Sequence, residues 1–215
     1  MRLVFGGSFD PVHFGHLRPL LEVQQRLAEA YAAMPVEIPV HLIPCAQPVH
    51  RDPPIATAEQ RMAMLQLAIE GQPGWQVDAR EIERGGESYM IDTLRSLKQE
   101  TVDFVTLVLG ADAFSGFMRW REPEQIVKLA NIIVCDRPDA PALEIPTELA
   151  DLLKPTDNPL DLEDTEAGLL WQAPVSQLQI SSTAIRQSID LGFDSRYWVP
   201  DAVRSYINLH GLYRI

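Results

Sequence analysis

The chain has 215 residues, of which 46% are hydrophobic and 22% are charged, as in an ordinary globular protein long enough to bury a core. Its formal net charge of −12 argues against a protein that binds the DNA or RNA backbone, because such a protein needs a basic face. No apolar run reaches the roughly 18 residues of a membrane span, and no signal-peptide pattern is present. We expect a cytoplasmic protein with one domain over 1–215, without nucleic-acid or membrane partners; the sequence does not indicate an oligomeric state.

Strand-like and helix-like patterns alternate along the first two thirds of the chain. Short apolar runs predict strands at 2–5, 40–43, 104–109 and 131–135. Apolar residues at helical spacing predict helices at 16–30, 58–69, 91–97 and 124–129, with Thr57 as the N-cap of the second. Cys45 and Cys135 lie in strand-like segments and are expected to be small buried side chains, neither metal ligands nor a disulfide.

The last third begins with a different composition. Residues 138–165 carry five prolines and many acidic residues, which predicts a surface excursion with one helical piece at 148–153. A strand at 169–173 follows, and 176–215 is expected to be helical, with helices at 182–191 and 201–209 and Gly211 as a C-cap. The alternation predicts an α/β fold: a Rossmann-like parallel sheet flanked by helices, with ligands at the carboxyl ends of the strands.

The first chemically informative segment runs from Gly6 to His16 and reads GGSFDPVHFGH, between the first strand and the first helix. Its two glycines let a ligand approach the backbone closely. His13 and His16 are three positions apart, so both can point the same way from the first helical turn. A helix start with two imidazoles predicts an anion site that suits a triphosphate. A glycine turn with two surface histidines is the alternative; a zinc pair is disfavoured, because no third ligand is evident.

The second informative segment, Ile180 to Arg186, reads ISSTAIR. Ser181 or Ser182 is a natural N-cap, which places Arg186 about one turn into the helix. Hydroxyls, free amides and a guanidinium at a helix start form a phosphate cradle. A capped helix without a ligand is the alternative for this segment taken alone.

The two segments together resemble the GxFDPxHxGH and ISSTxxR signatures of the HxGH nucleotidyltransferase superfamily, and they frame nearly the whole chain. Four shorter segments are similar to bacterial-type nicotinate mononucleotide adenylyltransferases: 44–51, 88–94, 110–120 and the Arg137-Pro138 turn. Two positions depart from that family's pattern. Val49 replaces a usual proline, and Met90 replaces a usual threonine, which removes a hydroxyl near the expected pyridine site.

This resemblance implies an enzyme that joins ATP and nicotinate mononucleotide to give nicotinate adenine dinucleotide and pyrophosphate, in NAD biosynthesis. The mononucleotide phosphate would attack the α-phosphorus in line, without a covalent enzyme intermediate, and Mg²⁺ would be carried by the ATP phosphates. The implied catalytic residues are His13, His16 and Arg186. The implied ATP-binding residues are Gly6, Gly7, Ser8, Phe9, His13, His16, Gly110, Asp112, Ile180, Ser182, Thr183 and Arg186. The implied mononucleotide-binding residues are His50, Arg51, Ser88, Tyr89, Met90, Trp120 and Arg137.

Structural alternatives remain for single residues: Trp120 as core, Asp112 as a helix N-cap and Tyr89 as packing. The same fold with another substrate, such as nicotinamide mononucleotide, phosphopantetheine or a cytidine nucleotide, is the nearest alternative function. A nucleotide sensor without activity is the alternative from another class. The intact His13, His16 and Arg186 argue against a sensor, which needs no groups around the α-phosphate.

Overall fold

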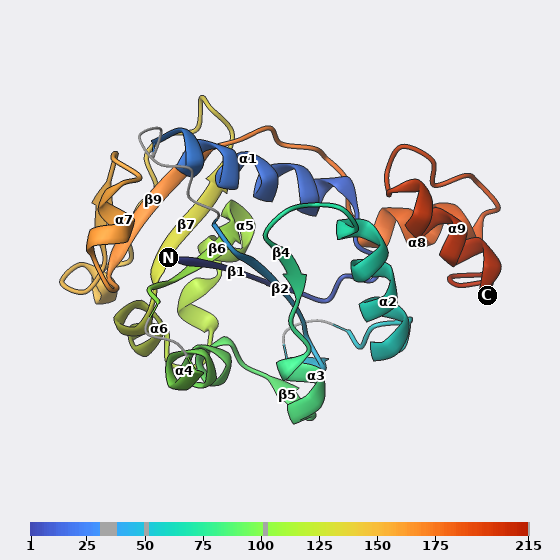
Figure 1. Ribbon diagram of the computed structural model, residues 1–215, viewed down its shortest axis with the longest axis horizontal. Helices are drawn as coiled ribbons and strands as arrows, with labels where there is room; N and C mark the ends of the chain where they lie inside the picture. The colour runs from blue at the N-terminus through green and yellow to red at the C-terminus, as the bar shows by residue number, and fades with distance from the viewer. Residues whose placement is uncertain (31–37, 50–51, 101–102, 215) are drawn as a thin grey trace.

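The computed structural model describes residues 1–30, 38–49, 52–100 and 103–214, which form a sheet covered by helices on both faces (Figure 1). Seven strands pair in parallel in the order β4-β2-β1-β6-β7-β9-β8. Their bounds are β1 Arg2–Gly7, β2 Val40–Pro44, β4 Trp75–Val77, β6 Val105–Gly110, β7 Asn131–Asp136, β8 Lys154–Thr156 and β9 Leu169–Pro174. The predicted α/β fold is confirmed.

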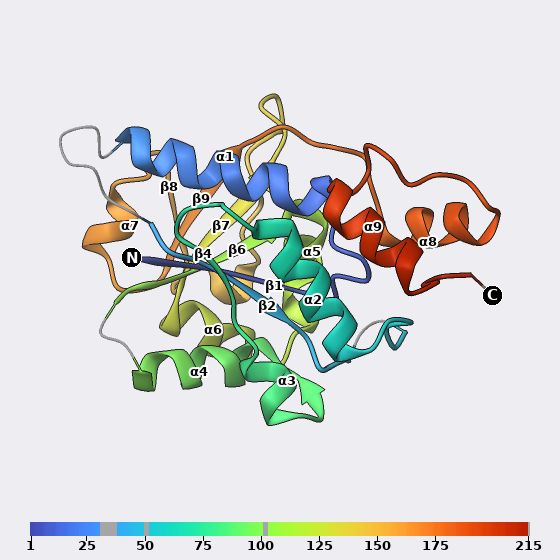
Figure 2. The ribbon, with the colours of Figure 1, turned by 45° about the vertical axis from the view of Figure 1, so that its right-hand side comes forward.

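Two groups of helices cover the two faces of the sheet. α1 (Phe14–Ala30) and α2 (Ala58–Ile69) pack on one face, and α4 (Met90–Glu100) and α6 (Pro123–Leu129) pack on the other. Of the C-terminal helices, α9 (Asp201–Leu209) packs beside α2, and α8 (Ser182–Asp190) lies beyond it, at one end of the sheet (Figure 2). The short helices are α3 Arg80–Arg84, α5 Ala111–Ser115, η1 Phe117–Arg119, η2 Thr147–Leu149 and α7 Asp161–Asp164.

The central strand β1 shows why the sheet is buried on both faces. Successive side chains of a strand point to opposite faces, so Leu3 joins the core on the α1 side and Val4 joins the core on the α4 side. Both side chains are fully buried. A short apolar run without polar alternation therefore folds as an interior parallel strand.

Local capping signals located two helices closely. α2 spans the predicted residues, and Thr57 and Gln60 form a capping box at its start. α9 also has the predicted bounds, and Gly211 follows it with a φ of 60°. Of the apolar stripe predicted for α2, Leu65 and Ile69 are buried as expected, whereas Met62 and Ala68 are only partly buried. The buried residues of α2 are Arg61, Met64, Leu65 and Ile69.

The segment 138–165 lies mostly at the surface, as expected, but it also adds a strand to the sheet and side chains to the core. The predicted helix at 148–153 is only the 3₁₀ turn η2, and 154–156 forms β8, which extends the sheet beside β9. Leu149, Leu153 and Leu162 are fully buried. Asn131 holds the segment in place, because its amide nitrogen donates to the carbonyls of Leu162 and Thr165 at 3.2 and 2.7 Å. The segment therefore contributes to the core.

A second sheet of two short strands, β3 (Gln47–Pro48) and β5 (Glu87–Ser88), lies outside the main sheet and was not predicted. Strands this short leave no periodic signal in a sequence.

None of the helices in the described part of the chain has the length and apolar character of a membrane span.

Candidate nucleotide-binding site

The predicted site lies at the edge of the sheet where β1 and β6 end. The chain passes from β1 to β2 on one side, and it returns later to place β6 on the other side of β1. This reversal of strand order leaves a crevice at the carboxyl ends of the strands, where ligands of such folds bind. β1 ends at Gly7 and β6 ends at Gly110, so the predicted glycine turn and the implied ATP-binding Gly110 both lie at this edge.

The turn after β1 is tightly packed. A Cβ atom on Gly6 would lie 2.8 Å from the Cε atom of Met90, and one on Gly7 would lie 3.1 Å from the ring of Phe9. Phe9 is buried with a φ of 50°, a conformation that non-glycine residues seldom adopt. Gly6 and Gly7 thus provide room that the side chains of Met90 and Phe9 fill.

The two histidines of the first motif stack on each other. Their ring centroids are 3.7 Å apart with an angle of 18° between the planes. The backbone amide of His13 donates to Nδ1 of His16 at 3.3 Å, which leaves the proton of a neutral His16 ring on Nε2. The edge of the Phe9 ring also packs against His16, with centroids 5.3 Å apart. The predicted common direction of the two imidazoles is confirmed.

Burial changes the chemistry expected of His13. Only 4% of this residue is exposed, and desolvation lowers the pKa of its imidazole to about 4. His13 is therefore neutral at pH 7 and contributes a polar group rather than a positive charge. Its Nδ1 atom is buried without a hydrogen-bond partner among the described residues, which is uncommon for a buried polar atom.

The first and second motifs meet at Gly15. A Cβ atom there would lie 3.0 Å from Nδ1 of His13 and 3.1 Å from the carbonyl oxygen of Ile180. Any larger residue at this position would push the Ile180 segment away from the start of α1. The glycine of the HxGH motif therefore allows the close contact of two segments that are far apart in the sequence.

The start of α8 is bonded directly to the turn of the first motif. Ser181 is the N-cap, and its hydroxyl accepts from the amide of Ala184. The Ser182 hydroxyl donates to the carbonyl of Pro11 at 3.0 Å. Arg186 donates from Nη1 to the carbonyl of Asp10 at 2.7 Å and from Nη2 to the Thr183 hydroxyl at 3.3 Å. The predicted phosphate cradle of α8 thus faces the turn that carries the histidines.

Arg61 is a residue of this region that the sequence analysis missed. It lies in α2 with 1% of its surface exposed, and it donates to the carbonyls of Ser8 and Cys45 at 2.8 and 2.7 Å. These carbonyls follow the ends of β1 and β2, so one guanidinium links both turns. Its Nε atom has no partner among the described residues. Its place four residues before Leu65, on the same helix face, was the available signal.

The predicted mononucleotide residues Ser88, Tyr89 and Met90 lie between β5 and the start of α4. The amide of Ala46 donates to the Ser88 hydroxyl at 2.9 Å, so this hydroxyl holds the loop after β2. Tyr89 donates from its hydroxyl to Glu87 at 2.6 Å, which raises the pKa of the phenol. Met90 is the first residue of α4, whose early amides lack partners within the helix.

The remaining predicted residues follow β6 and β7. Gly110 is the N-cap of α5, and Asp112 is exposed in its first turn. Trp120 is half-buried, and its ring packs on Phe117 with centroids 5.3 Å apart. Arg137 is exposed and follows β7. His50 and Arg51 lie outside the described residues.

Comparisons with known proteins agree with these motifs. The chain matches a family model described as cytidylyltransferase-like over residues 4–188. A protein of Hahella chejuensis (strain KCTC 2396) named "Probable nicotinate-nucleotide adenylyltransferase" is 41% identical over 98% of this chain and 94% of its own length. A protein of Pseudomonas entomophila (strain L48) with the same name is 42% identical over the same shares. This chain belongs to the nicotinate-nucleotide adenylyltransferase family.

The fold of this adenylyltransferase chain is also similar to solved structures. The Plasmodium falciparum nicotinic acid mononucleotide adenylyltransferase complexed with NaAD superimposes with a TM-score of 0.67 at 17% identity, over 99% of this chain and 96% of that one. The same protein complexed with APC gives a TM-score of 0.65 at 15% identity. At such low identity the likeness shows the fold alone.

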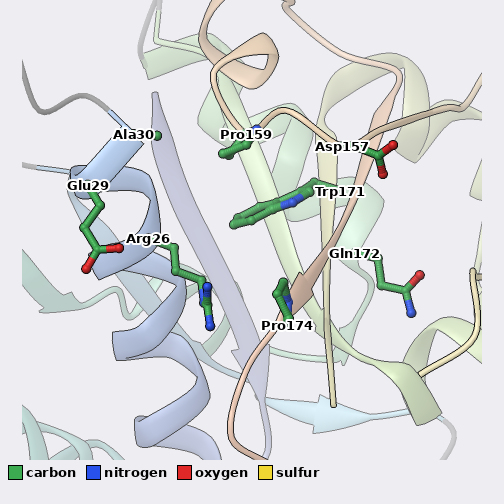
Figure 3. Close-up of a pocket in the computed structure, with 8 residues that line it drawn as sticks. All are labelled: Arg26, Glu29, Ala30, Asp157, Pro159, Trp171, Gln172 and Pro174. Atoms are coloured by element: carbon green, nitrogen blue, oxygen red, sulfur yellow. The ribbon is translucent and has the colours of Figure 1, made fainter. Parts of the chain in front are cut away.

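The hollows found elsewhere on the adenylyltransferase surface do not include the predicted site residues. One lies between the end of α1 and β9, and its lining includes Arg26, Glu29, Trp171 and Gln172 (Figure 3). A second lies in the C-terminal part, around Phe193 and Arg204. The candidate site is therefore identified by its polar side chains and not by one of these two hollows. It is the edge of the sheet bounded by the histidine turn, α8 and the start of α4.

Proposed function

We propose that this chain transfers the adenylyl group of ATP to nicotinate mononucleotide, giving nicotinate adenine dinucleotide and pyrophosphate in NAD biosynthesis. The observation that carries the proposal is the contact between the two motifs: Arg186 is bonded to Asp10, three residues before His13. Groups that suit a triphosphate thus come from both ends of the sequence to one edge of the sheet. The family membership of the chain supplies the substrate class.

The reaction calls for positioning more than for proton transfer. A phosphate nucleophile is largely ionised at pH 7 and needs no general base. We propose that His16 donates from Nε2 to the α-phosphate, because its Nδ1 already accepts from the backbone. Neutral His13 packs against that ring and adds a polar contact to the phosphates. Charge that develops on the α-phosphate then meets an oriented donor.

The leaving pyrophosphate is assigned to the start of α8. Ser182, Thr183 and Arg186 surround the first turn of this helix, where free amides and the helix dipole favour an anion. Among the described residues, two of the five N–H groups of Arg186 donate to protein acceptors, so its fork retains donors for phosphate oxygens.

The nucleoside and mononucleotide are assigned to the other edge of the site. We propose that Gly6, Gly7, Ser8, Phe9, Gly110, Asp112 and Ile180 line the ATP groove. The early amides of α4, around Met90, would donate hydrogen bonds to the nicotinate carboxylate, and Trp120 would stack on the pyridine ring. His50, Arg51 and Arg137 are proposed contacts of the mononucleotide phosphate.

The proposal places Mg²⁺ on the ATP phosphates. Among the described residues, no group of three His, Cys, Asp or Glu side chains could hold a metal ion. Mg²⁺ prefers phosphate and water oxygens, so a metal that arrives with ATP needs no protein cage. The surrounding residues His16 and Arg186 would orient the phosphates. The use of ATP is also consistent with our proposal of a cytoplasmic location.

The experiment that tests the function is turnover of ATP by the purified protein with three acceptors, measured as dinucleotide and pyrophosphate formed. We expect kcat/KM for nicotinate mononucleotide to exceed that for nicotinamide mononucleotide by at least roughly 10²-fold, because the amide presents an unmatched NH₂ to donors and loses a charge-assisted bond. Phosphopantetheine should not react. Comparable values for the two mononucleotides would make the enzyme one of dual specificity, and turnover of phosphopantetheine alone would contradict the proposal.

Variants at Met90 sharpen this test. Met90→Pro deletes the backbone N–H at the first position of α4, where proline is tolerated, and should lower the preference for the acid. Met90→Thr keeps that N–H and is the matched control, so it should change the ratio little. A larger loss in the threonine variant would move recognition to the side chain.

A further inference from the structure

Asp10 lies where four segments of the chain meet, and it belongs to none of the predicted contacts with substrate. Its side chain is buried, with 3% of the residue exposed. Its Oδ2 atom accepts from the amide of Ile55 at 2.8 Å, and its Oδ1 atom accepts from the amide of Ala56 at 3.1 Å. Oδ1 also accepts from the Tyr213 hydroxyl at 2.8 Å.

The fourth segment is the start of α8. Nη1 of Arg186 lies 3.7 Å from Oδ2 of Asp10 and donates to the carbonyl of the same residue. A buried carboxylate is costly unless donors surround it, and here three donors and one cation do so. The contacts of the Asp10 side chain therefore come from three separate parts of the chain: Ile55 with Ala56, Tyr213, and Arg186.

We propose that Asp10 is a positioning residue. Its carboxylate fixes the ATP-phosphate half of the site relative to the mononucleotide half, and the Tyr213 hydroxyl holds that carboxylate in place. This inference rests on the proposed function. Arg186 belongs to the half assigned to the triphosphate. Ile55 and Ala56 lead into α2, whose Arg61 holds the turn after β2, and that turn also bonds to Ser88, which is assigned to the mononucleotide. One carboxylate therefore contacts segments of both halves of the proposed site, and a shift of either segment disturbs the same group.

Burial and backbone conformation hold Tyr213 in a position from which its hydroxyl donates to Asp10. It is 4% exposed, and its φ is 65°, in the left-handed region that a bulky residue occupies only when its surroundings require it. Burial and the neighbouring Asp10 carboxylate raise the pKa of its phenol well above the usual value. Tyr213 therefore remains protonated at neutral pH and donates a hydrogen bond to Asp10.

The test is Tyr213→Phe, which keeps the ring and deletes only the hydroxyl. We expect kcat/KM for both substrates to fall roughly tenfold, the effect of one hydrogen bond to a charged group. Tyr206→Phe is the matched control: Tyr206 lies in α9, its ring packs on His210, and its hydroxyl has no hydrogen bond among the described residues. The control should stay within twofold of wild type.

Two further measurements separate positioning from general stability. Hydrogen exchange at the amides of Ile55 and Ala56, measured without ligands, should be roughly tenfold faster in Tyr213→Phe than in Tyr206→Phe. In an Arg186→Ala background, Tyr213→Phe should lower kcat/KM for ATP by much less than tenfold, because the two changes act on one contact.

The outcomes are distinguishable. A Tyr213→Phe protein that melts at a lower temperature but keeps wild-type kcat/KM, whether or not exchange changes, would overturn the positioning role. Additive effects with Arg186→Ala would also overturn it. If wild type binds ATP without using nicotinate mononucleotide, the proposed function fails, while exchange at Ile55 and Ala56 in the ligand-free protein still decides whether Tyr213 holds Asp10 against that segment.

Discussion

The half of the site assigned to the phosphates and the half assigned to the pyridine ring are built differently. Asp10, His13 and Arg61 are buried at 4% exposure or less; His13 stacks on the other imidazole of its motif, and Asp10 and Arg61 bond to other segments. Tyr89 and Trp120 are only partly buried, and the Arg121 guanidinium over the Tyr89 ring is about half exposed. Stabilising a developing charge needs donors fixed in advance, whereas stacking on a flat ring tolerates movement.

The largest effect is expected from His16→Ala, which removes the proposed donor to the α-phosphate from the phosphate half of the site. The variant should fold and lose roughly 10²–10³ in kcat, the usual effect of removing one transition-state donor. Steady-state kinetics beside circular dichroism measures both. A folded variant within a few-fold of wild type would show that His16 does not contact the reacting phosphate.

Arg186→Ala should follow, with a loss of roughly 10–100-fold in kcat/KM for ATP and little change in affinity for the mononucleotide. Arg186→Lys should recover only part of the loss, because an ammonium cannot reproduce a bidentate fork. Calorimetry with each substrate separates the two affinities. Equal losses for both would contradict the placement of Arg186 in the triphosphate half.

Trp120→Ala tests the open half and should raise KM for the mononucleotide roughly tenfold, since stacking is worth about 1–3 kcal/mol per ring. Trp120→Phe should be milder. Because Trp120 also packs on Phe117, thermal denaturation must accompany the kinetics. An unfolded alanine variant would favour a core role for this residue.

The smallest effect concerns stability rather than turnover. His13 has a folded pKa of about 4 against 6.5 when unfolded, so its neutral form stabilises the fold fully above pH 6.5. That contribution is lost as the pH falls from 6.5 through 4, by on the order of 2–3 kcal/mol. In His13→Gln the free energy of unfolding should fall less over this range. Parallel pH profiles of wild type and variant, measured by urea denaturation, would contradict the burial of a neutral imidazole.

Local signals in the sequence explain which parts of the fold could be predicted. Thr57 and Gly211 flank α2 and α9 and act on residues next to them, so these helices were located closely. The Pro-rich segment 138–165 gave no such signal, because β8 forms only by pairing with β9. Secondary structure that depends on a distant partner is invisible to a pattern of neighbouring residues.

The same distinction holds for the site. The motifs located His13, His16 and Arg186 at one edge, because glycine turns and helix starts are local features. Arg61 and the role of Asp10 could not be found in this way. Arg61 looks like one charge on a helix surface until its acceptors, 53 and 16 positions away, are known.

The position of β1 in the middle of the sheet has a consequence for how the protein folds. Leu3 pairs with Val40 on one side and with Thr106 on the other, so the first strand of the chain gains its second neighbour only after about half of the sequence is available. Closing loops of that length costs entropy before any contact offsets it, and parallel sheets therefore form slowly. The hydrogen bond between Asp10 and Tyr213 joins residues 203 positions apart, so it can form only when the end of the chain is in place. Nucleotide affinity should accordingly be among the last properties to return on refolding, well after helical circular dichroism has recovered.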